Sequence, residues 1–142
     1  VSPRQRLDVV VNALTIMALE KNVIKINGGK QMRPNIHIED LCDAYLWLLH
    51  RPELTGIYNA GFENLTVQEI SRKVAVKTNV RTATLPVVDP RSYRINSSKL
   101  LNTGFKPKKS VNHAIDELIS QYRAGQLRDA PGCYNIKSMP RM

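Results

Sequence analysis

The sequence lacks any long apolar run: no stretch of its 142 residues approaches the ~20 apolar residues that a helix needs to span a membrane. Its only two cysteines, Cys42 and Cys133, lie far apart and lack the spacing of metal ligands. No turn of the Gly-x-x-Gly-x-x-Gly type occurs, so no cradle for the phosphates of a dinucleotide is present. Cys42 falls in a predicted helix, where we expect a small core residue rather than a disulfide partner. Free thiols fit a reducing cytoplasm.

Aromatic residues are also few, at one tryptophan, five tyrosines and two phenylalanines, whereas basic residues are abundant and give a net charge of +9. Such a charge favours a polyanionic partner, and nucleic acid is the simplest one. The basic residues are nevertheless spread along the chain, and the scattered aromatic residues form no obvious stacking platform. Nucleic acid is therefore an alternative partner and not the leading one. If the chain is part of a longer protein, a more acidic N-terminal half outside these 142 residues would also balance the charge.

Residues 28–41 are the most informative stretch. Gly28 and Gly29 predict a turn, because glycine takes a positive φ without penalty. Pro34 disfavours helix just before itself, so Arg33 is expected to be extended.

The alternation of polar and apolar residues over 35–38 then predicts a strand. Asp40 is expected to cap a helix over 40–50 by accepting free backbone N–H groups. An arginine at the mouth of a strand, close to a helix N-terminus, suits an anion.

Apolar periodicity predicts alternating helices and strands along the rest of the chain, and hence an α/β fold. Thr66 and Glu69 have the spacing of a capping box at the start of one helix. The strand at 35–38 is expected to pair with the strand at 23–26 or to run beside it. The predicted helices cover residues 7–21, 40–50, 66–78, 97–103 and 110–124, and the predicted strands cover 23–26, 35–38, 56–60 and 82–85.

The stretch over 28–41, Gly-Gly-x-x-x-Arg-Pro-x-Ile-His-Ile-x-Asp-Leu, resembles a segment of the extended short-chain dehydrogenase/reductases, the nucleotide-sugar epimerases and dehydratases. Residues 2–4 (Ser-Pro-Arg) resemble the end of a strand-to-loop junction in that family, and residues 56–61 (Gly-Ile-Tyr-Asn-Ala-Gly) resemble a late strand of its sheet. Residues 104–107 (Gly-Phe-Lys-Pro) resemble its Gly-Phe-x-Pro turn before the last helix. The resemblance covers nearly the whole chain, in order, but only the C-terminal part of such enzymes.

The resemblance implies that residues 1–142 are the C-terminal substrate-binding lobe of an extended Rossmann-type enzyme, with late strands of the parent sheet and an incomplete fold. The N-terminal dinucleotide-binding portion would then be a missing partner that binds NAD or NADP, and this segment alone would bind neither. None of the five tyrosines has a lysine four residues later, so the Tyr-x-x-x-Lys acid/base pair of the family is also absent. We therefore expect the segment to be inactive alone and to be cytoplasmic, with a homodimer left open.

The resemblance also implies which residues bind the sugar nucleotide. The arginine of the Arg-x-x-Ile-His-Ile pattern contacts the diphosphate in the family, and it corresponds to Arg33. A later loop brings a second arginine or an acid to the nucleotide, and by position Arg91 is the better candidate and Asp89 the next. The family often has Arg-Asp where Arg33-Pro34 stands, which leaves the local geometry open. Alternatively, Arg33 pairs with a surface acid and Arg91 is a solvated loop residue.

Asp8, Asn12 and Thr15 share a narrow polar stripe on the first predicted helix. Either the stripe is a solvated edge or a hydrogen bond to a neighbouring segment, or Asp8 and Asn12 face a sugar nucleotide. His37 is expected to be structural rather than catalytic, because no catalytic partner accompanies it in the sequence.

Three functions remain open after these observations. The leading one is the substrate-binding part of an NAD(P)-dependent nucleotide-sugar epimerase or dehydratase. The second is a non-enzymatic binding protein of the same lineage, and the third is a basic nucleic-acid-binding module.

Overall fold

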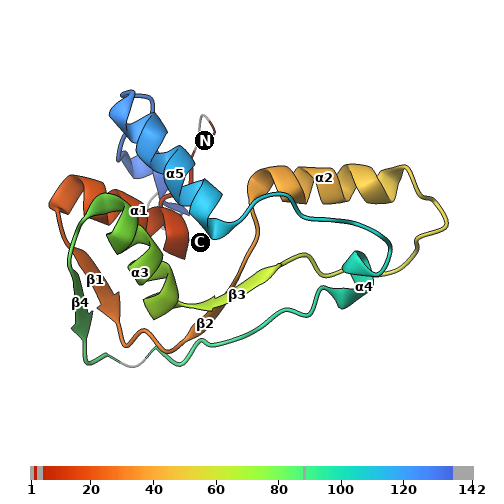
Figure 1. Ribbon diagram of the computed structural model, residues 1–142, viewed down its shortest axis with the longest axis horizontal. Coiled ribbons are helices and arrows are strands. Elements are labelled where there is room, and N and C mark those ends of the chain that lie inside the picture. Colours follow the sequence, from red (N-terminus) through yellow and green to blue (C-terminus); the bar gives the residue numbers. More distant parts are fainter. Residues whose placement is uncertain (1, 3–4, 88, 136–142) are drawn as a thin grey trace, which may run out of the picture.

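Helices and strands alternate along the chain in the computed structural model, which describes residues 2, 5–87 and 89–135 (Figure 1). The α/β class expected from the sequence is confirmed. The helices are α1 (Val10–Lys21), α2 (Ile38–Leu49), α3 (Val67–Thr78), α4 (Ser98–Leu101), α5 (Val111–Arg123) and the short 3-10 helix η1 (Pro131–Cys133). The strands are β1 (Ile24–Asn27), β2 (Met32–Asn35), β3 (Glu63–Thr66) and β4 (Thr82–Leu85).

The four strands form two separate two-stranded sheets. In the first, β1 pairs in parallel with β4 and Ile24 lies opposite Thr82; in the second, β2 pairs antiparallel with β3 and Met32 lies opposite Thr66. The expectation that the second strand pairs with the first or runs beside it is therefore wrong. That strand also begins three residues earlier than predicted, because Pro34 keeps its own neighbourhood extended and the following residues turn into α2.

The strand predicted over residues 56–60 is absent from the structure. The segment ends against Ser97, whose hydroxyl accepts a hydrogen bond from the Gly61 N–H at 2.9 Å and donates one to the Gly61 carbonyl at 3.0 Å. A side chain thus binds the backbone groups that a neighbouring strand would bind in a sheet. Residues 56–60 have the sequence pattern of a strand, but among the described residues no neighbouring strand pairs with them.

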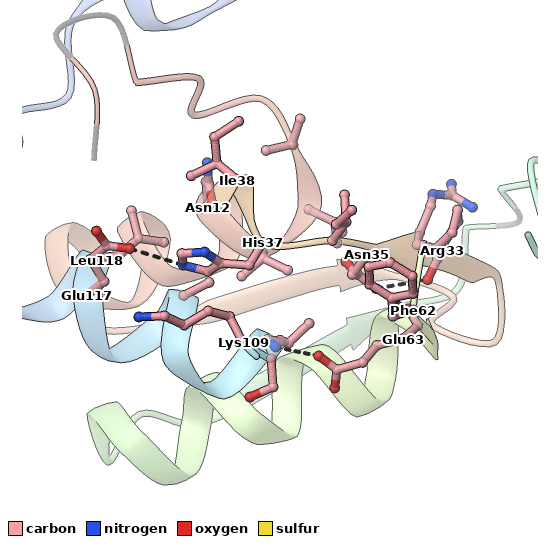
Figure 2. Close-up of a pocket in the computed structure, with 18 of the residues that line it drawn as sticks. Asn12, Arg33, Asn35, His37, Ile38, Phe62, Glu63, Lys109, Glu117 and Leu118 are labelled. Carbon is pink, nitrogen blue, oxygen red and sulfur yellow. Dashed lines mark hydrogen bonds and ion pairs between the residues drawn. The ribbon is translucent and has the colours of Figure 1, made fainter. Parts of the chain in front are cut away.

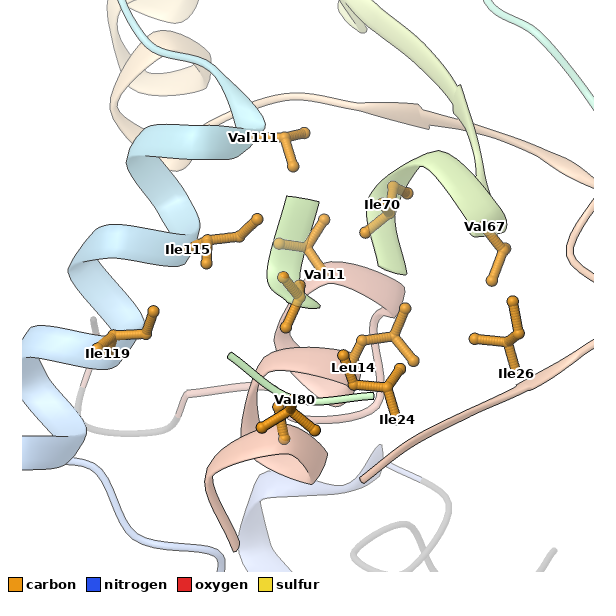
Figure 3. Close-up of a cluster of buried hydrophobic side chains, with 12 residues drawn as sticks. Val11, Leu14, Ile24, Ile26, Val67, Ile70, Val80, Val111, Ile115 and Ile119 are labelled. Atoms are coloured by element: carbon orange, nitrogen blue, oxygen red, sulfur yellow. The ribbon is translucent and has the colours of Figure 1, made fainter. Parts of the chain in front are cut away.

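The main core lies between α1, α3 and α5 on one side and β1 on the other (Figure 3). Each helix presents apolar side chains at helical spacing to this core, as the periodicity predicted. Its buried members are Val11, Leu14, Ala18, Ile24, Ile26, Val67, Ile70, Val74, Val80, Val111, Ile115 and Ile119. This packing fixes α1 and α5 next to each other, and both line the cavity described below.

The capping box at the start of α3 is confirmed. The Thr66 hydroxyl accepts a hydrogen bond from the Glu69 N–H at 3.1 Å, and the Glu69 carboxylate accepts one from the Thr66 N–H at 2.7 Å. The bonds from the backbone and hydroxyl of Thr66 lower the pKa of Glu69 below its ordinary value.

We expect the substitution Thr66→Ala to lower the free energy of unfolding by about 1 kcal/mol, because it removes the hydroxyl that caps α3. Urea denaturation followed by circular dichroism measures this change. Ser120→Ala, at an exposed position inside α5 where alanine favours the helix, is the control and should not destabilise the chain. Equal midpoints for the two variants would contradict the role of the cap.

Helix α2 starts two residues earlier than predicted, and its cap is His37 rather than Asp40. The Nδ1 atom of His37 accepts a hydrogen bond from the Glu39 N–H at 3.2 Å. Asp40 lies inside the helix, is only 1% exposed, and accepts backbone hydrogen bonds from Lys108 at 2.8 Å and Lys109 at 3.0 Å. Its carboxylate therefore joins α2 to the segment that leads into α5.

The inner face of α2 packs on a second apolar cluster, which includes a residue of α4. Figure 1 shows α2 and α4 together, away from α1, α3 and α5. Ala44, Leu100 and Phe105 are buried there, and the indole Nε1–H of Trp47 donates a hydrogen bond to the Thr103 hydroxyl at 2.9 Å. The opposite face of the same helix is exposed and also apolar. We call it the outer face of α2; it comprises Ile38, Cys42, Tyr45, Leu46 and Leu49. The expectation that Cys42 is a core residue is wrong, because its position on the helix turns it to this exposed face.

Candidate functional site

A cavity of about 500 Å³ lies between the segment before α1, the β2 strand with the turn into α2, and the first turns of α5 (Figure 2). Three of the five residues that the sequence analysis selected line it, namely Asp8, Asn12 and Arg33. The other two, Asp89 and Arg91, do not line the cavity but contact Arg33 at its edge. The structure thus brings all five residues, which come from three separate segments, to the lining or the edge of one cavity.

Arg33 lies at one end of the cavity, and its side chain is 16% exposed. Its Nη2 donates a hydrogen bond to the Asp89 carboxylate at 3.0 Å, and its Nη1 donates to the Met32 carbonyl at 2.9 Å and to the Arg91 carbonyl. The guanidinium carbon lies 5.8 Å from the centre of the Tyr93 ring. Arg33 therefore pairs with an acid, Asp89, in this structure. The sequence analysis gave pairing with an acid as the alternative to a ligand contact. Asp89 is, however, itself a candidate site residue.

Asp89 binds two arginines at once. Besides Arg33, it accepts hydrogen bonds from the Arg91 backbone N–H, Nε and Nη2 at 3.1, 2.8 and 3.0 Å. These bonds from Arg91, with the positive charges of Arg91 and Arg33, lower the pKa of Asp89 to about 2, so the carboxylate is charged at neutral pH. In turn, Asp89 raises the pKa of Arg91. The side chain of Arg91 is 79% exposed, whereas Arg94 faces a second, smaller hollow beside Asn96.

His37 and Glu117 form the opposite end of the cavity, and Figure 2 shows them apart from Arg33. His37 Nε2 lies 3.2 Å from the Glu117 carboxylate. Because Nδ1 of His37 accepts the cap bond from Glu39, its Nε2 carries the proton in the neutral ring and donates to Glu117. Both ring nitrogens of His37 therefore have protein partners: Nδ1 caps α2, and Nε2 binds Glu117 on α5.

Asp8 and Asn12 hold neighbouring segments together. The Asn12 amide donates to the Arg6 carbonyl at 2.6 Å, while Asp8 accepts from Arg6 Nε at 2.9 Å and from the Asn135 N–H at 2.9 Å. These bonds lower the pKa of Asp8, the contact with Arg6 contributing most. Thr15, the third member of the stripe, is buried and donates back to its own helix. Hydrogen bonding to a neighbouring segment, one of the two interpretations of the stripe, is therefore present in the structure.

The sequence analysis missed Glu63, Lys109 and Tyr93, which also line the cavity. The Glu63 carboxylate accepts the backbone N–H of Val111, the first residue of α5, and so neutralises that helix end. Lys109 Nζ lies 3.2 Å from the Glu39 carboxylate. No sequence signal marks Glu63, because its partner lies 48 residues away along the chain.

Three further findings concern metal ligands, membrane-spanning helices and the residues outside the described part of the chain. Among the described residues, no group of three or more His, Cys, Asp or Glu side chains is placed to hold a metal ion. None of the helices that the structure describes is both long and apolar enough to cross a membrane. Pro3 and Arg4, which contributed to the family resemblance, lie outside the described residues.

Comparison with known proteins gives a match to the NAD dependent epimerase/dehydratase family over residues 2–61. The fold is similar to that of dTDP-glucose 4,6-dehydratase from Bacillus anthracis, solved in complex with NAD, with a TM-score of 0.72 and 22% identity over 89% of this chain and 42% of that one. It is also similar to UDP-N-acetylglucosamine 4-epimerase from Bacillus cereus, with a TM-score of 0.72 and 17% identity over 93% of this chain and 45% of that one. For UDP-glucose 4-epimerase from Thermus thermophilus, solved with NAD, the TM-score is 0.65 and the identity 22%, over 84% of this chain and 43% of that one.

The chain therefore spans less than half the length of each of these structures, while most of its own length shares their fold. The family match covers the turn, β2 and α2, where the sequence resemblance was strongest. The match over residues 2–61 confirms that resemblance for this part of the chain, and most of the chain shares the fold of the epimerases and dehydratases named above.

Proposed function

We propose that this chain is the substrate-binding part of an NAD(P)-dependent nucleotide-sugar epimerase or dehydratase, and that Arg33 binds the diphosphate of the sugar nucleotide. The observation that carries the proposal is the pair of guanidinium groups, from Arg33 and Arg91, that meet on the single carboxylate of Asp89 at the edge of the cavity. Two guanidinium groups this close to each other form a site for a multiply charged anion, because each binds phosphate oxygens in a forked geometry.

The cavity next to this pair suits the rest of such a ligand. Its volume of about 500 Å³ lies within the usual range for small-molecule sites. Its walls combine apolar side chains with groups that hydrogen-bond hydroxyls, among them Asn12, Glu117 and the Asp8 carboxylate. We therefore assign the diphosphate to the Arg33 end and the neutral, hydroxyl-bearing part of the ligand to the cavity beside it.

We infer that the described residues do not bind NAD or NADP by themselves. A dinucleotide cradle needs a glycine-rich turn that leads from a strand into a helix N-terminus. Here Gly28 and Gly29 follow β1 but lead into β2 rather than into a helix. The N-terminus of α3 does reach this turn, but the Gln68 N–H there donates to the Gly29 carbonyl at 3.0 Å and is not free for a phosphate. We assign cofactor binding and hydride transfer to a portion of the enzyme outside these residues, and we expect the chain to turn over no sugar nucleotide by itself.

The outer face of α2 is our candidate contact for that portion. Ile38, Tyr45 and Leu49 on this face are 60%, 65% and 75% exposed, although the opposite face of the helix is already packed. A helix that is apolar on both faces is normally covered on both. We infer that the dinucleotide-binding portion covers this surface.

The test is the substitution Arg33→Ala in the protein that contains this chain. We expect it to weaken binding of UDP-, GDP- or dTDP-sugars by about 1.5–3 kcal/mol, because it removes a charge-assisted contact to the diphosphate. Isothermal titration calorimetry measures the affinity. Arg72→Ala, which removes an exposed positive charge from α3, is the control and should leave the affinity nearly unchanged. Equal affinities for the Arg33 variant and the parent would remove Arg33 from the site.

A non-enzymatic binding protein of the same lineage would bind these ligands equally well, so binding alone does not establish an enzyme. The distinguishing measurement is turnover of a UDP-, GDP- or dTDP-sugar by the protein containing this chain, with NAD or NADP present. Epimerised, dehydrated or reduced product supports the enzyme. Binding that depends on Arg33 without any product supports the binding protein.

A further inference from the structure

The carboxylate of Asp89 is fully occupied in this structure. It accepts four hydrogen bonds, one from Arg33 and three from Arg91, at distances between 2.8 and 3.1 Å. An ionised carboxylate offers about four lone-pair sites, so its accepting capacity is used completely by the two arginines. Its side chain is 15% exposed, and water reaches it poorly. Asp89 thus sits where an anionic ligand of the two guanidinium groups would sit.

Arg33 is correspondingly short of free donors. Three of its five N–H groups are engaged, two of them by backbone carbonyls and one by Asp89. An anion that approaches Arg33 in a forked geometry therefore competes with the negative charge of Asp89. The carboxylate also repels that anion, because its contacts with the two arginines keep it charged at neutral pH.

We propose that Asp89 is an internal counter-ion, which holds the guanidinium groups of Arg33 and Arg91 in the free chain and gives them up to a diphosphate. The inference rests on the proposed function, and it gives Asp89 a role different from a direct ligand contact. Displacement is favourable for a diphosphate because it carries more than one negative charge and more acceptor oxygens than one carboxylate. A singly charged anion gains no such advantage, so Asp89 makes the site selective for multiply charged anions.

The surrounding contacts allow this exchange without unfolding the site. The segment that carries Asp89 is attached to β2 further along, where the Ser92 hydroxyl accepts the Met32 N–H at 3.0 Å. It is attached to β3 through Asn64, whose amide forms a pair of hydrogen bonds with the backbone of Ile95 at 2.9 and 3.0 Å. Both attachments lie beyond Asp89, which itself has no side-chain bond to a helix or strand other than the one to Arg33 among the described residues.

The test uses inorganic pyrophosphate and acetate as probes, titrated into the 142-residue chain and followed by NMR of the arginine Nε–H groups. For Asp89→Asn, which keeps the shape and removes the charge, we expect about three- to tenfold tighter pyrophosphate binding and a smaller preference for pyrophosphate over acetate. Asp116→Asn is the matched control. It removes an equal charge from an ion pair with Lys77 on α3, and it should change neither affinity.

The outcomes separate the two proposals. If Arg33→Gln abolishes pyrophosphate binding but Asp89→Asn leaves it unchanged or weakens it, Asp89 is a positioning residue and the counter-ion proposal is wrong, while the diphosphate site stands. If Arg33→Gln has no effect in either the parent or the Asp89→Asn background, the diphosphate site itself is wrong. Tighter binding in Asp89→Asn that Arg33→Gln removes again supports both.

Discussion

Replacing Asp40 with alanine is expected to lower the free energy of unfolding by about 2–4 kcal/mol, because each of two backbone donors left without a partner costs about 1–3 kcal/mol. The carboxylate is 1% exposed and accepts the backbone N–H groups of Lys108 and Lys109 at 2.8 and 3.0 Å. Alanine leaves both donors without their partner in a place that water reaches poorly, and it leaves a small cavity between α2 and the segment before α5. Urea denaturation followed by the fluorescence of Trp47, which lies on the same helix, measures the loss.

Asp43→Ala is the matched control, because it removes the same charge from the same helix one turn later. Asp43 is 40% exposed and forms a single ion pair with Lys108 Nζ at 2.7 Å. Exposed pairs of this kind contribute about 0–1 kcal/mol, so the control should barely shift the midpoint. Similar losses for the two variants would show that the buried bonds of Asp40 contribute no more than a surface charge does.

The stability effect of Asp40 has a consequence for the site. Its two bonds hold the backbone just before Ser110, and Lys109, Ser110 and Val111 all line the cavity. The more conservative variant Asp40→Asn keeps one acceptor oxygen and places an amide group where the second one was. A folded Asp40→Asn protein should therefore bind nucleotide sugars more weakly even though Asp40 touches no ligand.

Asp40 also illustrates which features the sequence could predict. Aspartate before an apolar helical pattern is a strong local signal for a cap, and it misled because His37 takes that role three residues earlier. The true partners of Asp40 lie 68 and 69 residues away along the chain, beyond the reach of any local rule. Thr66 and Glu69 are only three residues apart, and their capping box was predicted correctly.

The same distinction holds for the candidate site. Arg33 and Asp89 were each selected from the sequence, but their pairing across 56 residues was not predicted, because it depends on how the segment after β4 returns to β2. Cys42 was assigned to the core from its helical pattern alone. Apolar periodicity on α2 extends around both faces, so the pattern could not decide which face packs on Phe105 and which stays exposed.

Ile70→Ala is expected to have a comparably large effect, about 2–5 kcal/mol of unfolding free energy, through packing rather than polarity. Ile70 on α3 is fully buried in the core that α3 shares with α1 and α5. Alanine lacks three of its side-chain carbons and therefore leaves a void. The helices close this void only in part, because their other contacts hold them in place. Val76→Ala on the same helix is the control: its side chain is 84% exposed and its truncation removes little buried area.

The Ile70→Ala variant also tests which parts of the fold hold the walls of the cavity. Because α1 and α5 line the cavity and both pack on α3, a void at Ile70 loosens the spacing of the cavity walls, while Arg33 and Asp89 lie on β2 and a connecting segment outside that core. At a temperature where the variant is still folded, Ile70→Ala should therefore weaken binding of a complete sugar nucleotide more than binding of inorganic pyrophosphate. An equal loss for both ligands would mean that the diphosphate end and the cavity do not depend on separate parts of the fold.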